Sequence, residues 1–225
     1  MQLFTSDIDW APEEVIADML NLFEQYSVKC TLFVTHDSEV IHKCNRELFE
    51  IAIHPNFNNR LFAEDKRTPK EIVQDLLDMY PEAVGMRSHS MTQSSQLLNV
   101  FAECGLQYDS NQFLPYQQVK PYKCWTGLTR IPYNWEDDVH FTYGKAFTSD
   151  GFGEYNGLRI YDFHPIHVFL NTDSNLTYLK AKPFYNNFHQ ISFYKNSDVF
   201  GTRDLLIKLL SSINNSNLHL KELNY

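Results

Sequence analysis

Basic residues, closely spaced cysteines and long apolar runs are all scarce in this chain of 225 residues. The formal net charge is −9, which argues against a nucleic-acid partner, because such partners need a basic face. The four cysteines show no CxxC spacing, so a structural zinc knuckle is not expected. No apolar run reaches membrane-spanning length, and the N-terminus lacks the regions of a signal peptide. We therefore expect a cytoplasmic protein that does not insert into membranes.

The composition is that of a globular protein. Hydrophobic residues make up 43% of the chain and aromatic residues 15%, which is enough for a sizeable core. We find no internal repeat, low-complexity tract or linker, so we expect one domain over residues 1–225. Oligomer formation is left open.

Strand-like runs alternate with amphipathic helix-like segments, which predicts an α/β fold. We expect strands at 3–8, 30–35, 49–53, 83–86, 128–132 and 158–163, and helices at 12–26, 68–80, 94–104 and 205–213. Residues 56–67 are expected to form a long loop at the active side, and residues 171–196 to be irregular. A doubly wound sheet and a barrel both fit this pattern. Polar groups follow several strands, and a barrel gathers such positions at one face, which favours the barrel.

Two aspartates end the first strand. Asp7 and Asp9 are two positions apart, so their side chains share a side if the chain stays extended. Neighbouring carboxylates repel unless a cation or a shared proton relieves them, which makes the pair a candidate metal or catalytic site. The alternative is an ordinary strand-to-helix turn with Asp9 as a cap.

Histidines follow later strands, and this strengthens the case for a site. A single histidine is usually a surface or hydrogen-bonded residue, and we interpret five in that way: His36, His42, His140, His189 and His219. Four others closely follow predicted strands, where barrel sites are built: His54, His89, His164 and His167. Trp10, Trp125 and Trp135 are each expected in the core, with stacking on a sugar ring as the alternative.

The order of these motifs resembles the polysaccharide deacetylase family, also called the NodB-homology domain, over nearly the whole chain. The matching segments are Ser6–Pro12, Thr31–Val34, Glu50–His54, Gly85–Arg87 and Phe163–Pro165. Tyr108–Ser110 followed by Arg130–Pro132 resembles its intracellular, allantoinase-like branch. The resemblance implies a distorted (β/α) barrel that binds a divalent metal, expected to be zinc, and acts on a carbohydrate or other small molecule.

Two departures from the family pattern affect the metal site. Ile8 separates the aspartates, which are usually adjacent, and Asn58 stands where the second metal histidine is usual. An amide oxygen is a weaker zinc ligand than an imidazole. We therefore expect Asp9, His54 and His89 as ligands. Asn58 is the competing third ligand or a substrate contact.

The resemblance implies hydrolysis of an amide, with Asp7 as general base, Arg87 orienting it, and His164 as general acid. Asp162 is expected beside His164, where it would raise the pKa of the imidazole, with a structural cap as its alternative role. His167 is expected to contact the substrate or to orient His164, and Trp10 is the candidate for the stacking alternative as a substrate contact.

We expect an N-deacetylase of an acetamido sugar or glycan precursor. The alternatives are a cyclic-amide hydrolase of the allantoinase type, and a non-catalytic carbohydrate-binding or assembly module.

Overall fold

The computed structural model describes residues 1–61, 64–118, 120–154, 156–213 and 217–223. The strands are β1 (Gln2–Asp7), β2 (Cys30–Val34), β3 (Phe49–Ile53), β4 (Gly85–Met86), β5 (Tyr108–Asp109), β6 (Tyr122–Lys123), β7 (Thr129–Arg130), β8 (Trp135–Glu136) and β9 (Arg159–Asp162). The α-helices are α1 (Glu13–Tyr26), α2 (Glu39–Lys43), α3 (Asn58–Leu61), α4 (Pro69–Met79), α5 (Ser95–Glu103), α6 (Asp137–Thr142), α7 (Pro165–Leu170), α8 (Asn175–Ala181), α9 (Phe188–Ile191) and α10 (Thr202–Ser211). Short 3₁₀ helices are η1 (His89–Met91), η2 (Lys182–Phe184), η3 (Ser192–Tyr194) and η4 (Leu220–Glu222).

The strands form one sheet in the order β6-β7-β5-β4-β3-β2-β1-β9-β8. Every neighbouring pair is parallel except β6 with β7. Over the described ranges β6 and β8 are the two edges and do not pair with each other. The barrel that the sheet forms is therefore open and distorted. The predicted (β/α) barrel of the NodB type is confirmed.

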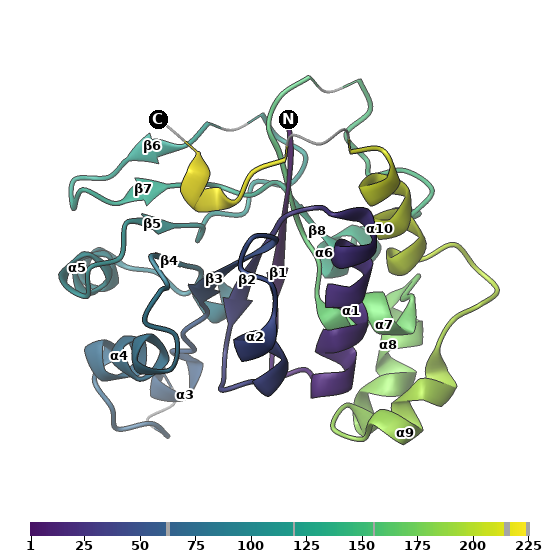
Figure 1. Ribbon diagram of the computed structural model, residues 1–225, viewed down its shortest axis with the longest axis horizontal. Coiled ribbons are helices and arrows are strands. Elements are labelled where there is room, and N and C mark those ends of the chain that lie inside the picture. The colour runs from purple at the N-terminus through teal and green to yellow at the C-terminus, as the bar shows by residue number, and fades with distance from the viewer. Residues whose placement is uncertain (62–63, 119, 155, 214–216, 224–225) are drawn as a thin grey trace.

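The first strand lies within this sheet, between β2 and β9, and Figure 1 shows it beside β2. Its residues alternate between the two faces. Leu3 packs on one face with Phe33 and Ile160 in a small apolar cluster. Phe4, on the other face, meets the ring of Phe23 in α1 with centroids 5.8 Å apart.

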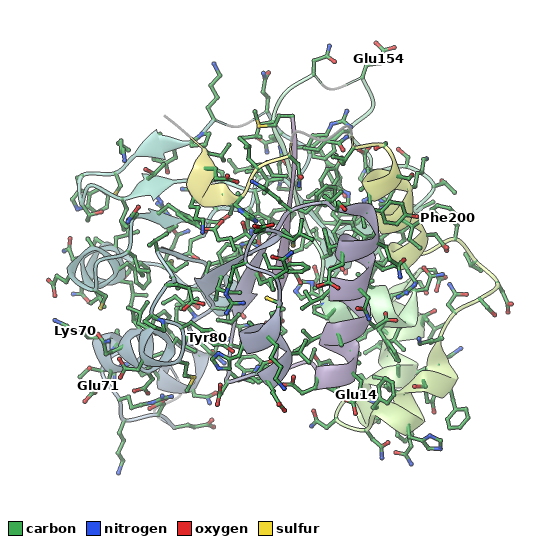
Figure 2. The ribbon with its side chains drawn as sticks, viewed as in Figure 1. Glu14, Lys70, Glu71, Tyr80, Glu154 and Phe200 are labelled. Atoms are coloured by element: carbon green, nitrogen blue, oxygen red, sulfur yellow. The ribbon has the colours of Figure 1, made fainter. Side chains whose placement is uncertain are left out.

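Helices cover the sheet in two groups (Figure 1). One group comprises α1, α7 and α10, and the other comprises α4 and α5. Thr68 caps α4, accepting a hydrogen bond from the Glu71 backbone N–H while the Glu71 carboxylate accepts one from Thr68 N–H, so the predicted capping box is present. Figure 2 labels Lys70 and Glu71 in this first turn. No helix in the described ranges has the length and apolar character to cross a membrane.

The expectation of an irregular segment over residues 171–196 is wrong, because it contains α8 and α9. Ser174 and Asn187 cap these helices with their side chains. The helices are too short to show a clear apolar period, which is why the sequence pattern missed them. The expected loop at 56–67 likewise includes α3, and no strand or helix was predicted where α2, α6, β5, β6 and β8 lie.

Candidate active site

Side chains from four strand ends meet in one cavity of about 120 Å³. Asp7 ends β1, His54 directly follows β3, Arg87 directly follows β4, and His164 lies two residues beyond β9. Since the carboxyl ends of parallel strands lie at one rim, these residues converge there. The lining is Asp7, Asp9, His54, Arg87, Ser88, His89, Ser90, Met91, Tyr133, Glu136, Asp138 and His164.

The segment after β1 is a tight turn and not an extended strand end. Asp9 and Trp10 both have left-handed backbones, with φ of 43° and 56°. Residues other than glycine adopt this region at a cost, so other contacts must hold the turn. The Trp10 N–H donates to Thr35 Oγ1 at 3.1 Å, and the Tyr185 hydroxyl donates to the Asp9 carbonyl at 2.7 Å. The expectation that Asp7 and Asp9 converge only on an extended chain is therefore wrong, because the turn brings them together.

Asp9, His54 and His89 form a compact group of donor atoms, all within 4.8 Å of one another. Asp9 Oδ1 lies 3.3 Å from His54 Nε2 and 3.1 Å from His89 Nδ1. Burial acts to raise the pKa of Asp9, but hydrogen bonds from the two histidines outweigh burial and lower it. Burial disfavours charge on His54, yet Asp7 and Asp9 raise its pKa. One carboxylate oxygen and two imidazole nitrogens are a donor set suited to zinc, so these residues fit a divalent metal.

Two further groups among the described residues also bring three donors together. They are Asp137 with His164 and His167, and Asp7 with Asp162 and His164. Their members are all buried, and their carboxylates are engaged in hydrogen bonds with His164, Arg87 and Thr5. The group around Asp9 is the more accessible, because the side chains of Asp9 and His89 keep 24% and 25% exposure.

Asn58 lies outside the cavity lining. Its amide nitrogen donates to Ser90 Oγ at 3.0 Å, and its amide oxygen accepts from Thr92 Oγ1 at 3.4 Å. These bonds connect α3 to the segment around η1, which carries His89. A ligand or substrate role for Asn58 stays a prediction.

Arg87 is fully buried and shared between two carboxylates. Its Nη1 donates to Asp7 Oδ1 at 2.8 Å and also to Asp162. Burial disfavours its charge, but Asp162 and Asp7 outweigh burial and raise the pKa of the guanidinium. The guanidinium also lies between the rings of Phe33 and Tyr133, 4.3 and 3.8 Å from their centroids. Arg87 therefore stays charged and fixed beside Asp7, whose own pKa is raised by burial against the opposing charge of Arg87.

The His164 ring is held by a residue that sequence reasoning missed. His164 Nδ1 lies 2.7 Å from Asp137 Oδ1, and His164 N–H donates to Asp137 Oδ2 at 2.9 Å. Burial alone would lower the pKa of His164, but Asp137 raises it well above the ordinary value. Burial raises the pKa of Asp137 to about 6, although His164 acts to lower it. Asp162 lies near His164 and raises its pKa as a nearby charge, as expected, but the Asp162 carboxylate is bonded to Thr5 and Arg87, and Asp137 has the larger effect.

Three consecutive acids, Glu136, Asp137 and Asp138, stand at this point of the rim. Burial, and then the charge of Asp138, raise the pKa of Glu136 well above its usual value. One sequence feature could have pointed to Asp137. The aromatic stretch before it ends in acids, just as the first strand ends in Asp7 and Asp9.

The remaining predicted substrate contacts lie beside this cavity. His167 is buried one turn into α7, with Nδ1 3.2 Å from Thr172 Oγ1. Burial, and then the charge of His164, lower the pKa of His167 well below its usual value. Trp10 is 41% exposed and meets the His89 ring with centroids 5.1 Å apart. Trp135 lies in the core as expected, but the core position expected for Trp10 and Trp125 is wrong, since Trp10 is exposed and Trp125 is 71% exposed.

A family model described as "WbmS-like: Polysaccharide deacetylase" matches residues 4–182. A Bordetella bronchiseptica protein, described as a polysaccharide deacetylase involved in O-antigen biosynthesis, has a crystal structure that is 34% identical to this chain. The match covers 93% of this chain and 89% of that one, with a TM-score of 0.86. No curated protein matches.

More distant structures share the fold. A polysaccharide deacetylase from Mycobacterium smegmatis is 19% identical, with 73% of this chain and 76% of that one covered and a TM-score of 0.53. A peptidoglycan N-acetylglucosamine deacetylase, Bc1960, is 11% identical, with 97% and 85% covered and a TM-score of 0.53. Neither the family model nor these structures supports the allantoinase-like branch or a non-catalytic module.

Proposed function

Because this chain belongs to the WbmS-like polysaccharide deacetylase family, we propose that it is a metal-dependent N-deacetylase of an acetamido sugar in a glycan or glycan precursor. The proposal is supported above all by two side chains at one cavity, Asp7 and His164, each of which is paired with a partner of opposite charge. Asp7 is paired with the Arg87 guanidinium, and His164 is paired with the Asp137 carboxylate. A carboxylate and an imidazolium in such surroundings suit a general base and a general acid.

In this proposal Asp9, His54 and His89 hold the divalent metal. When bound, it would supply Lewis acidity to the attacking water and to the amide carbonyl. Zinc is the expected ion, because one carboxylate and two imidazoles match its common ligands.

The chain's own residues carry the proton transfers. Asp7 Oδ2 lies 3.6 Å from His54 Nε2, beside the proposed ligands, and would take a proton from the attacking water. His164 Nε2 lies 3.7 Å from Asp9 Oδ2 and would give its proton to the amine nitrogen as the carbon–nitrogen bond breaks. The products are acetate and the free amino sugar.

Arg87 and Asp137 act as positioning residues. Arg87 fixes the Asp7 carboxylate through the 2.8 Å hydrogen bond, and Asp137 fixes the His164 ring through contacts with Nδ1 and the backbone N–H. Both are fully buried, so their orientation does not depend on solvent.

The direct test is release of acetate from acetamido sugars by the zinc-loaded protein. We expect acetate and free amine in equal amounts, detected by proton NMR, and no ring opening of cyclic amides. Metal-loaded protein that releases no acetate from any acetamido sugar would contradict the proposal.

The cytoplasm remains the proposed location. All four cysteines are free thiols, which supports a reducing compartment.

A further inference from the structure

Residues 174–197 contain no aspartate or glutamate, although the whole chain has a formal net charge of −9. The same residues include three lysines, Lys180, Lys182 and Lys195, and all three are exposed. Among the described residues, the lysine ion pairs are Lys29 with Glu222 and Lys43 with Glu39, so the three lysines have no carboxylate partner there. We call residues 174–197 the acid-free segment. It carries positive charge on a chain that is otherwise negative.

The acid-free segment folds into one group of short helices. It comprises α8, η2, α9 and η3. Helix α8 contacts η2 and η3, and α9 contacts the same two elements. Figure 1 shows α8 and α9 at the lower right, far from β6 and β7 at the upper left. The positive charge is therefore confined to one side of the molecule.

Large apolar side chains of this segment face solvent. Leu176 in α8 is 63% exposed and Phe193 in η3 is 77% exposed. Leu179, also exposed, lies three residues after Leu176, and Lys180 lies four residues after it, so the three side chains share one face of α8. A single exposed leucine is ordinary. Apolar side chains that gather on a segment with lysines and no acids indicate an interaction surface.

Lysine and aromatic side chains lie side by side in the same layer. Lys195 Nζ lies 3.7 Å from the centroid of the Phe169 ring, and that ring meets Phe188 with centroids 5.4 Å apart. Lys182 Nζ lies 5.7 Å from the centroid of the Tyr178 ring. Aromatic rings, leucines and lysines together are the composition of protein surfaces that lie in the headgroup region of a bilayer.

The charge of the segment disfavours a second copy of this chain as its partner. In a twofold dimer the same surface of both copies meets, so the lysines of one copy would face those of the other. Like charges placed opposite one another reduce affinity. The exposure of Phe193 also disfavours a groove, because a side chain that is 77% exposed projects from the surface. A bilayer accepts projecting apolar side chains and attracts lysines when its lipids are anionic.

We propose that the exposed side of the acid-free segment docks on the surface of a bilayer that contains anionic lipid. Leu176, Leu179 and Phe193 would enter the headgroup region, and the lysines would lie beside the lipid phosphates. Such docking needs no spanning helix. The acids elsewhere on the chain oppose it weakly, because salt screens exposed charges that are more than about 8 Å apart at physiological ionic strength.

The other side of the segment borders the candidate active site. Asn175, Tyr178 and Tyr185 line a cavity of about 330 Å³. That cavity shares Asp9 and His164 with the cavity of about 120 Å³ at the strand ends, which we call the reaction cavity. Docking would therefore hold the rim of the sheet next to the bilayer. The inference goes beyond the proposed deacetylase function and does not depend on it.

The first experiment measures sedimentation of the protein with vesicles. Vesicles of phosphatidylcholine alone are compared with vesicles that also contain about 30% phosphatidylglycerol. One lysine near an anionic surface strengthens binding about fivefold, so we expect partition to the anionic vesicles to be at least about tenfold stronger. Raising the salt from about 0.1 M to about 0.5 M should weaken that binding. Equal partition to both kinds of vesicle, or none to either, would overturn the proposal.

Variants then locate the surface. We expect Phe193→Ser, and Lys180→Glu combined with Lys182→Glu, each to weaken partition to the anionic vesicles about tenfold or more. These side chains are exposed, so the fold should be retained, as circular dichroism would verify.

Matched controls change the same properties elsewhere on the molecule. Trp125→Ser removes an aromatic side chain that is 71% exposed between β6 and β7. Lys66→Glu combined with Lys70→Glu reverses two exposed charges beside and within α4, and Figure 2 labels Lys70 at the left, on the opposite side of the view from α8 and α9. Both controls should bind as the wild type. Loss of binding in the controls as large as in the variants would mean nonspecific adsorption and would overturn the proposal.

The second experiment asks whether Phe193 enters the bilayer. Phe193→Trp places an indole at that position, and anionic vesicles with brominated acyl chains quench indoles that reach them. We expect more quenching of this variant than of the wild type. Quenching equal to that of the wild type would refute the docking of this face.

The remaining outcomes separate this proposal from its alternatives. A dimer in light scattering that Phe193→Ser dissociates, without vesicle binding, would make the segment an interface between copies and overturn the proposal. Vesicle binding needs neither metal nor turnover. The expected vesicle binding without acetate release would refute the deacetylase function alone, and acetate release without vesicle binding would refute the docking alone.

Discussion

Replacing Asp137 by asparagine removes the charge nearest the His164 ring while keeping the size of the side chain. The carboxylate is fully buried and lies 2.7 Å from His164 Nδ1. A hydrogen bond to a charged group contributes about 1.5–3 kcal/mol, and this one favours the protonated imidazole. Loss of this hydrogen bond lowers the pKa of His164 towards and below its ordinary value. Burial lowers that pKa, and the carboxylate of Asp137, which raises it most, is then gone.

The direction of the pH effect follows from the protonation state that the reaction needs. His164 must carry a proton to act as the acid, so its pKa sets the alkaline limb of kcat/KM against pH. Asp137→Asn should move that limb to lower pH. Above the new limb we expect kcat/KM to fall about a hundredfold or more, the lower range for a general acid. Well below pH 6, where the wild-type Asp137 is itself protonated, the two profiles should converge.

The assay measures acetate release from about pH 5 to about pH 10, roughly the range in which a change in the protonation of His164 can be observed. The metal content of the variants is held equal. Asp18→Asn is the matched control, because it removes an ion pair with Arg203 and lies outside the lining of the reaction cavity. An alkaline limb that stays at the wild-type pH in Asp137→Asn would remove His164 from the role of acid.

Three further outcomes are expected. His89→Ala should lose stoichiometric metal by mass spectrometry while Asn58→Ala keeps it, and the reverse result would exchange the two as third ligand. Asp7→Asn should reduce turnover at least about a hundredfold with metal retained, because it lacks the proton acceptor; loss of metal as well would make Asp7 a ligand. Thr68→Ala should destabilise the fold by about 1 kcal/mol in urea titration, since it removes a helix cap, and an unchanged midpoint would mean the cap contributes nothing.

The sequence predicted those parts of the fold that local patterns determine. The Thr68 capping box and the apolar run at 30–35 are local signals, and both correspond to the structure. Strands β4 to β8 have two residues each, too few for a period to be visible, and β5, β6 and β8 were missed for that reason. These short strands pair with neighbours that are distant in sequence, so tertiary contacts determine which residues form a strand.

The same limit applies to the site. His54, Arg87 and His164 could be placed because each follows a strand in a motif with a family resemblance. The partner of His164 could not be predicted, since Asp137 and Asp162 both lie near a strand end. Which of the two acids contacts His164 depends on how β8 and β9 align. In the structure Glu136 pairs with Asp162 across these strands, and Asp137 is the next residue beyond. Register therefore determines which acid reaches the imidazole.

The position of β9 beside β1 has a consequence for how the chain is made. Thr5 donates to the Tyr161 carbonyl, 156 residues further along, so one side of β1 stays unpaired until that residue has left the ribosome. Until then the nascent chain carries an open parallel edge, and Arg87 lacks its partner Asp162. Pairings between such distant residues form slowly and leave intermediates prone to association. The rim that carries the proposed site residues is thus completed late in synthesis, and chaperone binding to nascent chains that end before β9 should be stronger than to the full chain.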